Sequence, residues 1–406
     1  MTCVKIIGIG EFSATILVRR AMIAAIFDKG LPMNLVFLVL SAMLAMVGAW
    51  LLPLVGDLQR AAHVHLAFAL GVMPLIMGAM THFVPVLTRT GAAARQVQLL
   101  AGLAWQAGVL ATAFFAFSLP PSVRLFAALL AVLAVARLAG WQWMRARAAL
   151  GSPHPGVYWY LAALFCLLLA LLAVAGMDAW PAQYLALKRL HLHLNLFGFV
   201  GLSAVGTLQV LLPTAAGQPD PQVAARLRGD LPAALGGTLL IALGAAWLPL
   251  LSALGLLLWL VPVGRLGVAW LARYRSGIFQ RHGAMPLLAA ALAGVVLSLL
   301  AGGAHGAGWL DSTGVAHLFV FSFLFPLVSG AAGQLLPLWF RPGRQTEWHD
   351  WARCRLTFAA GFRALLFLAA GLLVLAGFRW AAWLALAALL PFPLAALGVL
   401  WRARRA

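Results

Sequence analysis

Apolar stretches of about twenty residues follow one another along almost the whole chain, with short polar segments between them. Each stretch can cross a hydrocarbon core about 30 Å thick as an α-helix. The breaks fall at proline, glycine and charged residues, as at Pro120-Pro121 and from Gly151 to Gly156. The pattern predicts twelve spans, at 33–55, 62–88, 97–118, 122–145, 157–178, 189–213, 231–250, 252–273, 284–306, 313–339, 357–377 and 380–401. Pro262 and Arg265 interrupt the eighth of these.

Composition agrees with an all-α integral membrane protein. Of 406 residues, 64% are apolar and 9% are charged, whereas a soluble domain is about half apolar and about a quarter charged. Such a chain has too few polar residues to give several soluble domains a water-facing surface. The expected surroundings are therefore membrane lipid.

The net charge of +19 does not indicate nucleic-acid binding, because the arginines lie in short connections and at the termini. Alternate connections are rich in arginine, for example around Arg145, Arg273 and Arg341, and the others are nearly free of it. The basic side of a membrane protein faces the cytoplasm. Both termini are therefore expected there, and residues 1–30 are expected to form a cytoplasmic or interfacial segment.

A threefold internal repeat is visible in the spacing of three residue types. His65, His193 and His317 are each followed by glycine at plus 13 and by proline at plus 20. The offsets are 128 (193 − 65) and 124 (317 − 193). Spans four, eight and twelve end in Arg-x-Arg at similar offsets. We expect three four-helix copies, at 31–150, 151–280 and 281–406.

Five histidines lie in the outer turns of the equivalent spans two, six and ten: His63, His65, His191, His193 and His317. Ionisable side chains at membrane depth are rare and line functional interiors, and imidazole is a common metal ligand. The alternative is that these side chains only bond water or backbone in the interfacial layer.

The His-x-His spacing limits what these residues can bind. Residues two apart on an α-helix point about 200° apart, so neither His63 with His65 nor His191 with His193 can chelate one ion. Such a pair can serve two centres, or one ligand position and a group that supports it. A macrocycle held between two helices and a copper ion bound by one histidine from each of three helices both remain open.

The other histidines receive structural interpretations. His82, near the inner end of span two, is expected to bond a neighbouring helix, and His305 is a further candidate for the outer metal layer. His154, His282 and His349 lie in basic loops and are interpreted as solvated.

The positions of the acidic residues argue against one class of membrane protein. All nine Asp and Glu residues, Asp230 among them, are assigned to tails, loops or span ends, which argues against a proton-coupled transporter. Arg137 and Arg265 lie within spans four and eight, where reaching towards the inner headgroups explains them.

Twelve spans in three copies, with outer histidines on spans two, six and ten, resemble subunit I of the haem-copper oxidases. In that family spans two and ten supply haem ligands and span six a copper ligand. The resemblance implies His63 or His65 together with His317 as haem ligands, and His191 or His193 as a metal ligand. Span seven has no histidine here and span ten has only one, so the oxygen-reducing binuclear centre is not implied.

The segments from His63 to Gly78 and from His191 to Gly206 are also similar to the NnrS family of bacterial haem- and copper-containing membrane proteins. That resemblance implies haem b and/or copper, a multi-pass protein of the bacterial inner membrane, and nitric oxide or a similar diatomic as ligand in denitrification or nitrosative stress. Oxidase or reductase subunits are the implied partners. A divergent nitric oxide reductase or terminal-oxidase-like enzyme subunit, a small-solute or metal transporter, and a metal-delivery factor remain alternatives.

Overall fold

The structure is a computed structural model that describes residues 35–52 and 59–405. Within these residues it contains helices and connecting turns, with no strand. Eleven of the described helices are long and apolar enough to cross a membrane, and the shorter apolar helix α2 (Leu35–Leu51) corresponds to the first predicted span. The chain is therefore a multi-pass membrane protein. The N-terminal segment 1–30 lies outside the described residues.

The helices follow the predicted spans in order. Spans two, six and ten each consist of several consecutive helices. Span two contains α3 (Arg60–His65), η2 (Leu66–Val72) and α4 (Met73–Thr88), and span six contains η3 (Pro181–Gln183), α8 (Tyr184–His193), η4 (Leu194–Leu202) and α9 (Ser203–Ala216). Span ten contains α13 (Ser312–Leu318), η5 (Phe319–Leu324) and α14 (Phe325–Phe340). The others are α5 (Arg95–Ala116), α6 (Pro121–Arg147), α7 (Gly156–Ala179), α10 (Val223–Ala246), α11 (Pro249–Ile278), α12 (Met285–Gly306), α16 (Ala360–Leu375), and η6 (Arg379–Ala381) with α17 (Ala382–Leu389) and α18 (Pro391–Arg405).

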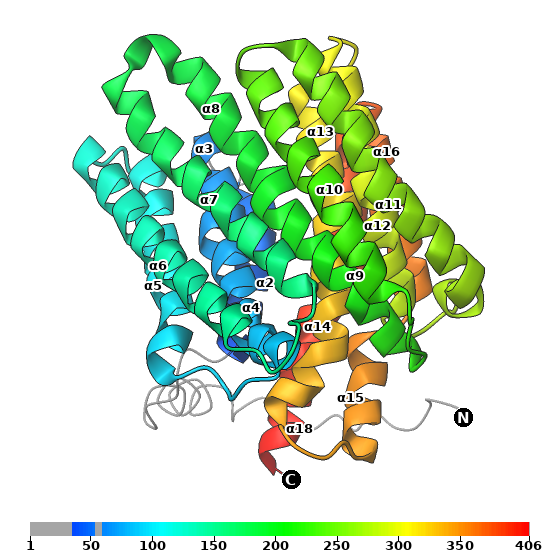
Figure 1. Cartoon of the computed structure of the whole chain (residues 1–406). Coiled ribbons are helices and arrows are strands. Elements are labelled where there is room, and N and C mark those ends of the chain that lie inside the picture. Colours follow the sequence, from blue (N-terminus) through cyan, green and yellow to red (C-terminus); the bar gives the residue numbers. More distant parts are fainter. Residues whose placement is uncertain (1–34, 53–58, 406) are drawn as a thin grey trace, which may run out of the picture.

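Figure 1 shows the long helices packed side by side, with α3, α8 and α13 towards one end of the bundle. Helices α4, α9 and α14 lie towards the other end, where the C-terminus and the short helix α15 (Glu347–Leu356) are also found. Below, the end with α3, α8 and α13 is called the outer end, and the end with α15 the inner end.

The predicted start of span seven is wrong. It was expected at residue 231, but α10 begins two turns earlier, at Val223, and includes Arg226 and Asp230. Hydropathy excluded this charged turn, but the bundle accommodates it because Arg226 and Asp230 find partners on neighbouring helices. Span eight, which Pro262 and Arg265 interrupt in the sequence, is helical through both residues.

The middle of each composite span is a π-helix packed between the two helices that flank that span in the sequence. η2 packs against α2 and α5, η4 against α7 and α10, and η5 against α12 and α16. π-helical turns are rare and concentrate at functional sites. The three central spans therefore share one local architecture, and each carries its histidines on the outer side of the π-helical segment.

Close backbone contact at a π-helical segment depends on glycine in the flanking helix. A Cβ atom at Gly294 of α12 would overlap the carbonyl oxygen of Ser322 in η5, and one at Gly108 of α5 would overlap the backbone of Ala69 in η2. Small residues let membrane helices approach closely enough for backbone packing to hold them together.

Gly294→Ala is expected to destabilise the protein by about 1–3 kcal/mol, because the added methyl group forces α12 away from η5. Gly302 lies in the same helix, and a Cβ atom there would have no neighbouring atom within 4 Å. Gly302→Ala is therefore the matched control, with unchanged stability or a gain of up to about 1 kcal/mol from helix propensity. Thermal unfolding of both variants in detergent measures this, and equal stabilities would contradict the packing argument.

Candidate functional site: the outer histidine layer

The five candidate histidines lie where the α-helical turns of the central spans meet their π-helical segments. His65 and His193 immediately precede η2 and η4, and His317 lies two residues before η5. His63 and His191 lie two residues earlier on the first two of these spans. The positions predicted from the repeat are thus placed in equivalent local structures.

His65, His193 and His317 each make the same hydrogen bond. The ring Nδ1 lies 2.6–2.8 Å from the backbone oxygen four residues earlier: His65 from Ala61, His193 from Arg189 and His317 from Thr313. A carbonyl oxygen can only accept a hydrogen bond, so Nδ1 carries the proton. In the neutral ring, Nε2 then keeps its lone pair, which is the form in which imidazole binds a metal.

His191 is oriented by a different helix. Its Nδ1 donates to the backbone oxygen of Ala170 in α7 at 2.8 Å, which leaves its Nε2 with a lone pair as well. The His191 ring also lies within electrostatic range of the His65 ring. Histidines from spans two and six, which are far apart in the sequence, are therefore brought together at the outer end.

Aromatic side chains surround the layer. The ring centroid of Trp50 lies 4.5 Å from that of His317, and Phe115 lies 4.5 Å from His65. On the inner side of the histidines, Phe319 contacts both Phe68 at 6.3 Å and Phe197 at 6.2 Å. These three phenylalanines belong to spans ten, two and six, so the central spans meet directly beneath the histidine layer.

The structure does not assemble a three-ligand metal site. Across the part of the chain that it describes, no group of three or more His, Cys, Asp or Glu residues lies close enough to hold one ion. One copper ion bound by a histidine from each of spans two, six and ten is therefore not supported by this arrangement. Single imidazoles or pairs, with Nδ1 fixed by a carbonyl and Nε2 bearing the lone pair, fit an axial ligand of a haem or a two-coordinate metal.

His305 and His82 lie at opposite ends of the bundle. His305 is exposed at the end of α12, bonds the Leu310 oxygen at 2.8 Å, and interacts electrostatically with His193. It therefore borders the outer layer. His82 contacts the Trp339 ring of span ten edge-on at 5.8 Å, a contact between neighbouring helices.

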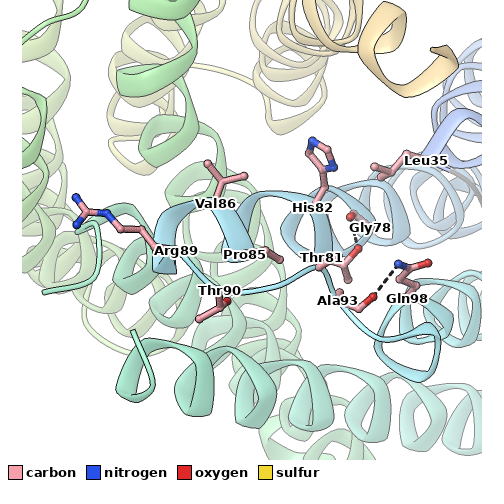
Figure 2. Close-up of a pocket in the computed structure, with 11 residues that line it drawn as sticks. Leu35, Gly78, Thr81, His82, Pro85, Val86, Arg89, Thr90, Ala93 and Gln98 are labelled. Atoms are coloured by element: carbon pink, nitrogen blue, oxygen red, sulfur yellow. Dashed lines mark hydrogen bonds between the residues drawn. The ribbon is translucent and has the colours of Figure 1, made fainter. Parts of the chain in front are cut away.

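His82 also lines a cavity of about 640 Å³ at the inner end of α4. Figure 2 shows His82 and Val86 on one side of that helix, with Gln98 donating to the Ala93 oxygen nearby. None of the five outer histidines lines this cavity. His82 follows His65 by almost five helical turns, about 25 Å along the helix, so this cavity is separate from the outer layer.

The interpretation of the loop histidines as solvated is wrong for His349, which is only 2% exposed. Its Nδ1 accepts from the Thr346 amide at 3.0 Å and its Nε2 donates to the Arg341 oxygen at 2.9 Å, closing the start of α15. His154 is partly buried and accepts the Gly156 amide at 3.2 Å. His282 is exposed and accepts the Ala359 amide at 3.2 Å.

The sequence did not identify these loop histidines as acceptors of backbone amides, although one signal was present. His154 and His282 are separated by the same interval as His65 and His193, the first two histidine markers of the repeat. Each precedes the helix that begins the next span, α7 or α12, and accepts a backbone amide through Nδ1.

Comparison with protein-family models and with curated proteins finds no match for this chain. Any functional assignment therefore depends on the residues and their geometry.

The stability of the wild-type protein is expected to fall below about pH 6.5 partly through His154. Burial, and then the positive charge of Arg228, lower the pKa of His154 from its ordinary value of 6.5. As pH drops through that value the unfolded chain takes up a proton that the folded chain resists, so folding weakens.

His154→Asn removes this dependence, and the variant should lose less stability than wild type between about pH 7.5 and about pH 5.5, by less than about 1 kcal/mol. Thermal melts of both proteins across that range measure the difference. Parallel curves would show that the His154 ring is not held neutral by the fold.

Proposed function

We propose that this chain is a haem- and/or copper-binding protein of the bacterial inner membrane, with both termini cytoplasmic, that handles nitric oxide or a similar diatomic. The observation that carries the proposal is the repeated hydrogen bond from histidine Nδ1 to a carbonyl on all three central spans. It prepares three outer imidazoles in the ligand form at equivalent places.

The proposed haem ligands are His317 of span ten and His63 or His65 of span two, with His191 and His193 as metal-facing residues. Trp50 and Phe321 pack against the His317 ring and Phe115 against His65. These contacts restrict rotation of the imidazoles and exclude water from their faces. A bound haem iron or copper ion would supply the electron-rich centre to which a diatomic gas binds.

The threefold repeat is part of this proposal. It is supported by the three π-helical segments, each packed between the spans that precede and follow it in the chain. It is supported also by the common Nδ1 bonds. Ligands on equivalent positions would then arise by repetition of one four-helix unit, and single residues from different helices would together form a cofactor site.

The cytoplasmic placement of the termini is supported by the distribution of arginine. The inner connections contain Arg89, Arg147, Arg281 and Arg344, whereas the outer ones contain few basic residues. At the outer end, Arg124 forms an ion pair with Asp178 between α6 and α7. Positive residues retained on one side orient a membrane protein with that side in the cytoplasm.

An apolar cavity gives a diatomic gas space within the membrane, below the histidine layer. It has a volume of about 100 Å³ and lies between the three central spans, with Ile76, Ala204 and Leu327 in its lining. A water molecule occupies about 30 Å³ of liquid, so a diatomic gas fits the space. Leu327 follows His317 by almost three helical turns, which places the cavity about 15 Å further into the membrane than the histidine layer.

Purified wild-type protein is expected to show a Soret band and at least one equivalent of haem or copper. His317→Ala should abolish the band or shift it, because it removes the lone pair that binds iron, and His65→Ala should weaken it. His82→Ala is the matched control, since His82 lies at the inner end of the same span as His65, and its spectrum should match wild type.

The measurement is an oxidised and dithionite-reduced visible spectrum with haem extraction and copper analysis. A colourless protein with less than one equivalent of either metal would overturn the proposal. Nitric oxide titration of the reduced protein then tests the ligand.

A small-solute transporter is the second candidate, because one observation now favours it. The sequence placed no carboxylate inside the membrane, and this is wrong for Asp230, which is fully buried within the spanning helix α10. An ionisable group at that depth is typical of coupled transport. Solute uptake into proteoliposomes that survives His317→Ala but not Asp230→Asn would favour transport over cofactor binding.

A further inference from the structure

Asp230 and Arg265 lie at one depth in the inner half of the membrane. Asp230 lies before Ala246, the outer end of α10, and Arg265 lies after Pro249, the outer start of α11. The number of residues in between is the same in both helices. That interval corresponds to about 24 Å of helix. In a core about 30 Å thick, both residues are therefore about 6 Å from the inner boundary.

The Asp230 carboxylate is fully enclosed and poorly solvated by the protein. None of its surface is exposed, and among the described residues no group makes an aligned hydrogen bond to either oxygen. The Nη1 atom of Arg265 lies 2.9 Å from Oδ1, close enough for an ion pair but without hydrogen-bond geometry. A buried carboxylate with one misaligned cation is costly as an anion, and protonation removes much of that cost.

The other charges around Asp230 are already engaged. Arg226, one turn earlier on the same face of α10, donates from Nη2 to Asp220 at 2.7 Å and from Nε to Gln209 at 3.1 Å. Arg273 of α11 also pairs with Asp220, at 3.7 Å. Arg265 is thus the cation that remains for Asp230.

Asp220 and the groups bonded to it lie on the inner side of Asp230. Asp220 lies in the connection between α9 and α10, and its side chain is only 4% exposed. Burial disfavours its charge, but the hydrogen bond from Arg226 and the nearby positive charges outweigh this and keep the pKa of Asp220 below its ordinary value. The Nε2 of buried Gln209 has no partner among the described residues.

The Arg265 guanidinium can lie in either of two positions. Its side chain is 56% exposed on the lipid-facing side of α11 while its guanidinium contacts Asp230. The inner headgroup layer, about 6 Å away, is within reach of an arginine side chain. When the guanidinium pairs with Asp230 the carboxylate is held ionised, and when it turns to the headgroups the neutral acid is favoured.

We propose that Asp230 is a proton-binding site in the inner half of the membrane, in exchange with the inner aqueous phase. Arg265 controls its occupancy by pairing either with Asp230 or with the headgroup layer. The step is a single protonation: the carboxylate takes one proton from the inner aqueous phase and returns it without a redox change. The site is independent of any cofactor at the outer end.

Infrared difference spectroscopy of the protein in lipid bilayers, stepped between about pH 5 and about pH 9, tests this directly. A protonated carboxylic acid has a C=O stretch that the carboxylate lacks. Wild type is expected to show such a band that appears as pH falls. Asp230→Asn should remove it, while Asp220→Asn, which alters the neighbouring ion pair, should keep the band.

Arg265→Gln supplies the second arm and keeps the test decisive if Asp230→Asn does not fold. Removing the cation should move the midpoint of the band up by at least about one pH unit, a tenfold rise in proton affinity. A band that is absent in wild type at every pH, or unchanged in both Asp230→Asn and Arg265→Gln, would show that the Asp230–Arg265 pair is a permanent structural ion pair. The result does not depend on whether the protein binds haem or copper.

Discussion

The hydrocarbon core offers no hydrogen-bond partner, and the rest of the structure follows from that. Backbone amides and carbonyls must pair within each span, so the described chain crosses only as helices. The same condition applies to side chains. His65, His193 and His317 each bond a carbonyl of their own helix. In satisfying Nδ1, each fixes the tautomer that leaves Nε2 as an acceptor, so a bond required by the apolar surroundings also prepares a metal ligand.

The central spans depart from regular α-helix at one level, and the departure is built into the packing. Each π-helical segment lies between two flanking helices, and glycines such as Gly108 and Gly294 allow backbone contact there. Because a wider turn shifts the helix face that follows, the segments set how the outer histidines are oriented relative to the apolar cavity between the spans. Phe319 contacts Phe68 and Phe197 on the inner side of the histidines.

The two ends of the bundle carry different chemistry. The outer end gathers neutral, fixed imidazoles against aromatic rings, whereas the inner end of spans six to eight holds a network of arginines and carboxylates around Asp220 and Asp230. The first suits a metal or a haem, and the second suits a proton. The separation matters for either function proposed, because a group that binds a metal and a group that exchanges protons can be altered independently.

Helical class, the succession of apolar spans and the positions of the histidines were determined by the sequence, because hydropathy and the spacing of the histidine, glycine and proline markers are properties of the chain alone. The sequence also excluded chelation of one ion by either His-x-His pair, since that depends only on helical pitch. The tertiary structure decided which groups each polar side chain bonds. Hydropathy began span seven at Leu231 because Arg226 and Asp230 are polar, and only packing against Gln209 and Arg265 shows why they lie inside. His349 was predicted to be solvated because it lies in a basic loop. Its burial and its bonds to Thr346 and Arg341 result from how that connection folds back. A sequence fixes what each side chain can donate or accept, but whether the bond is made depends on groups that the fold alone brings within about 3 Å.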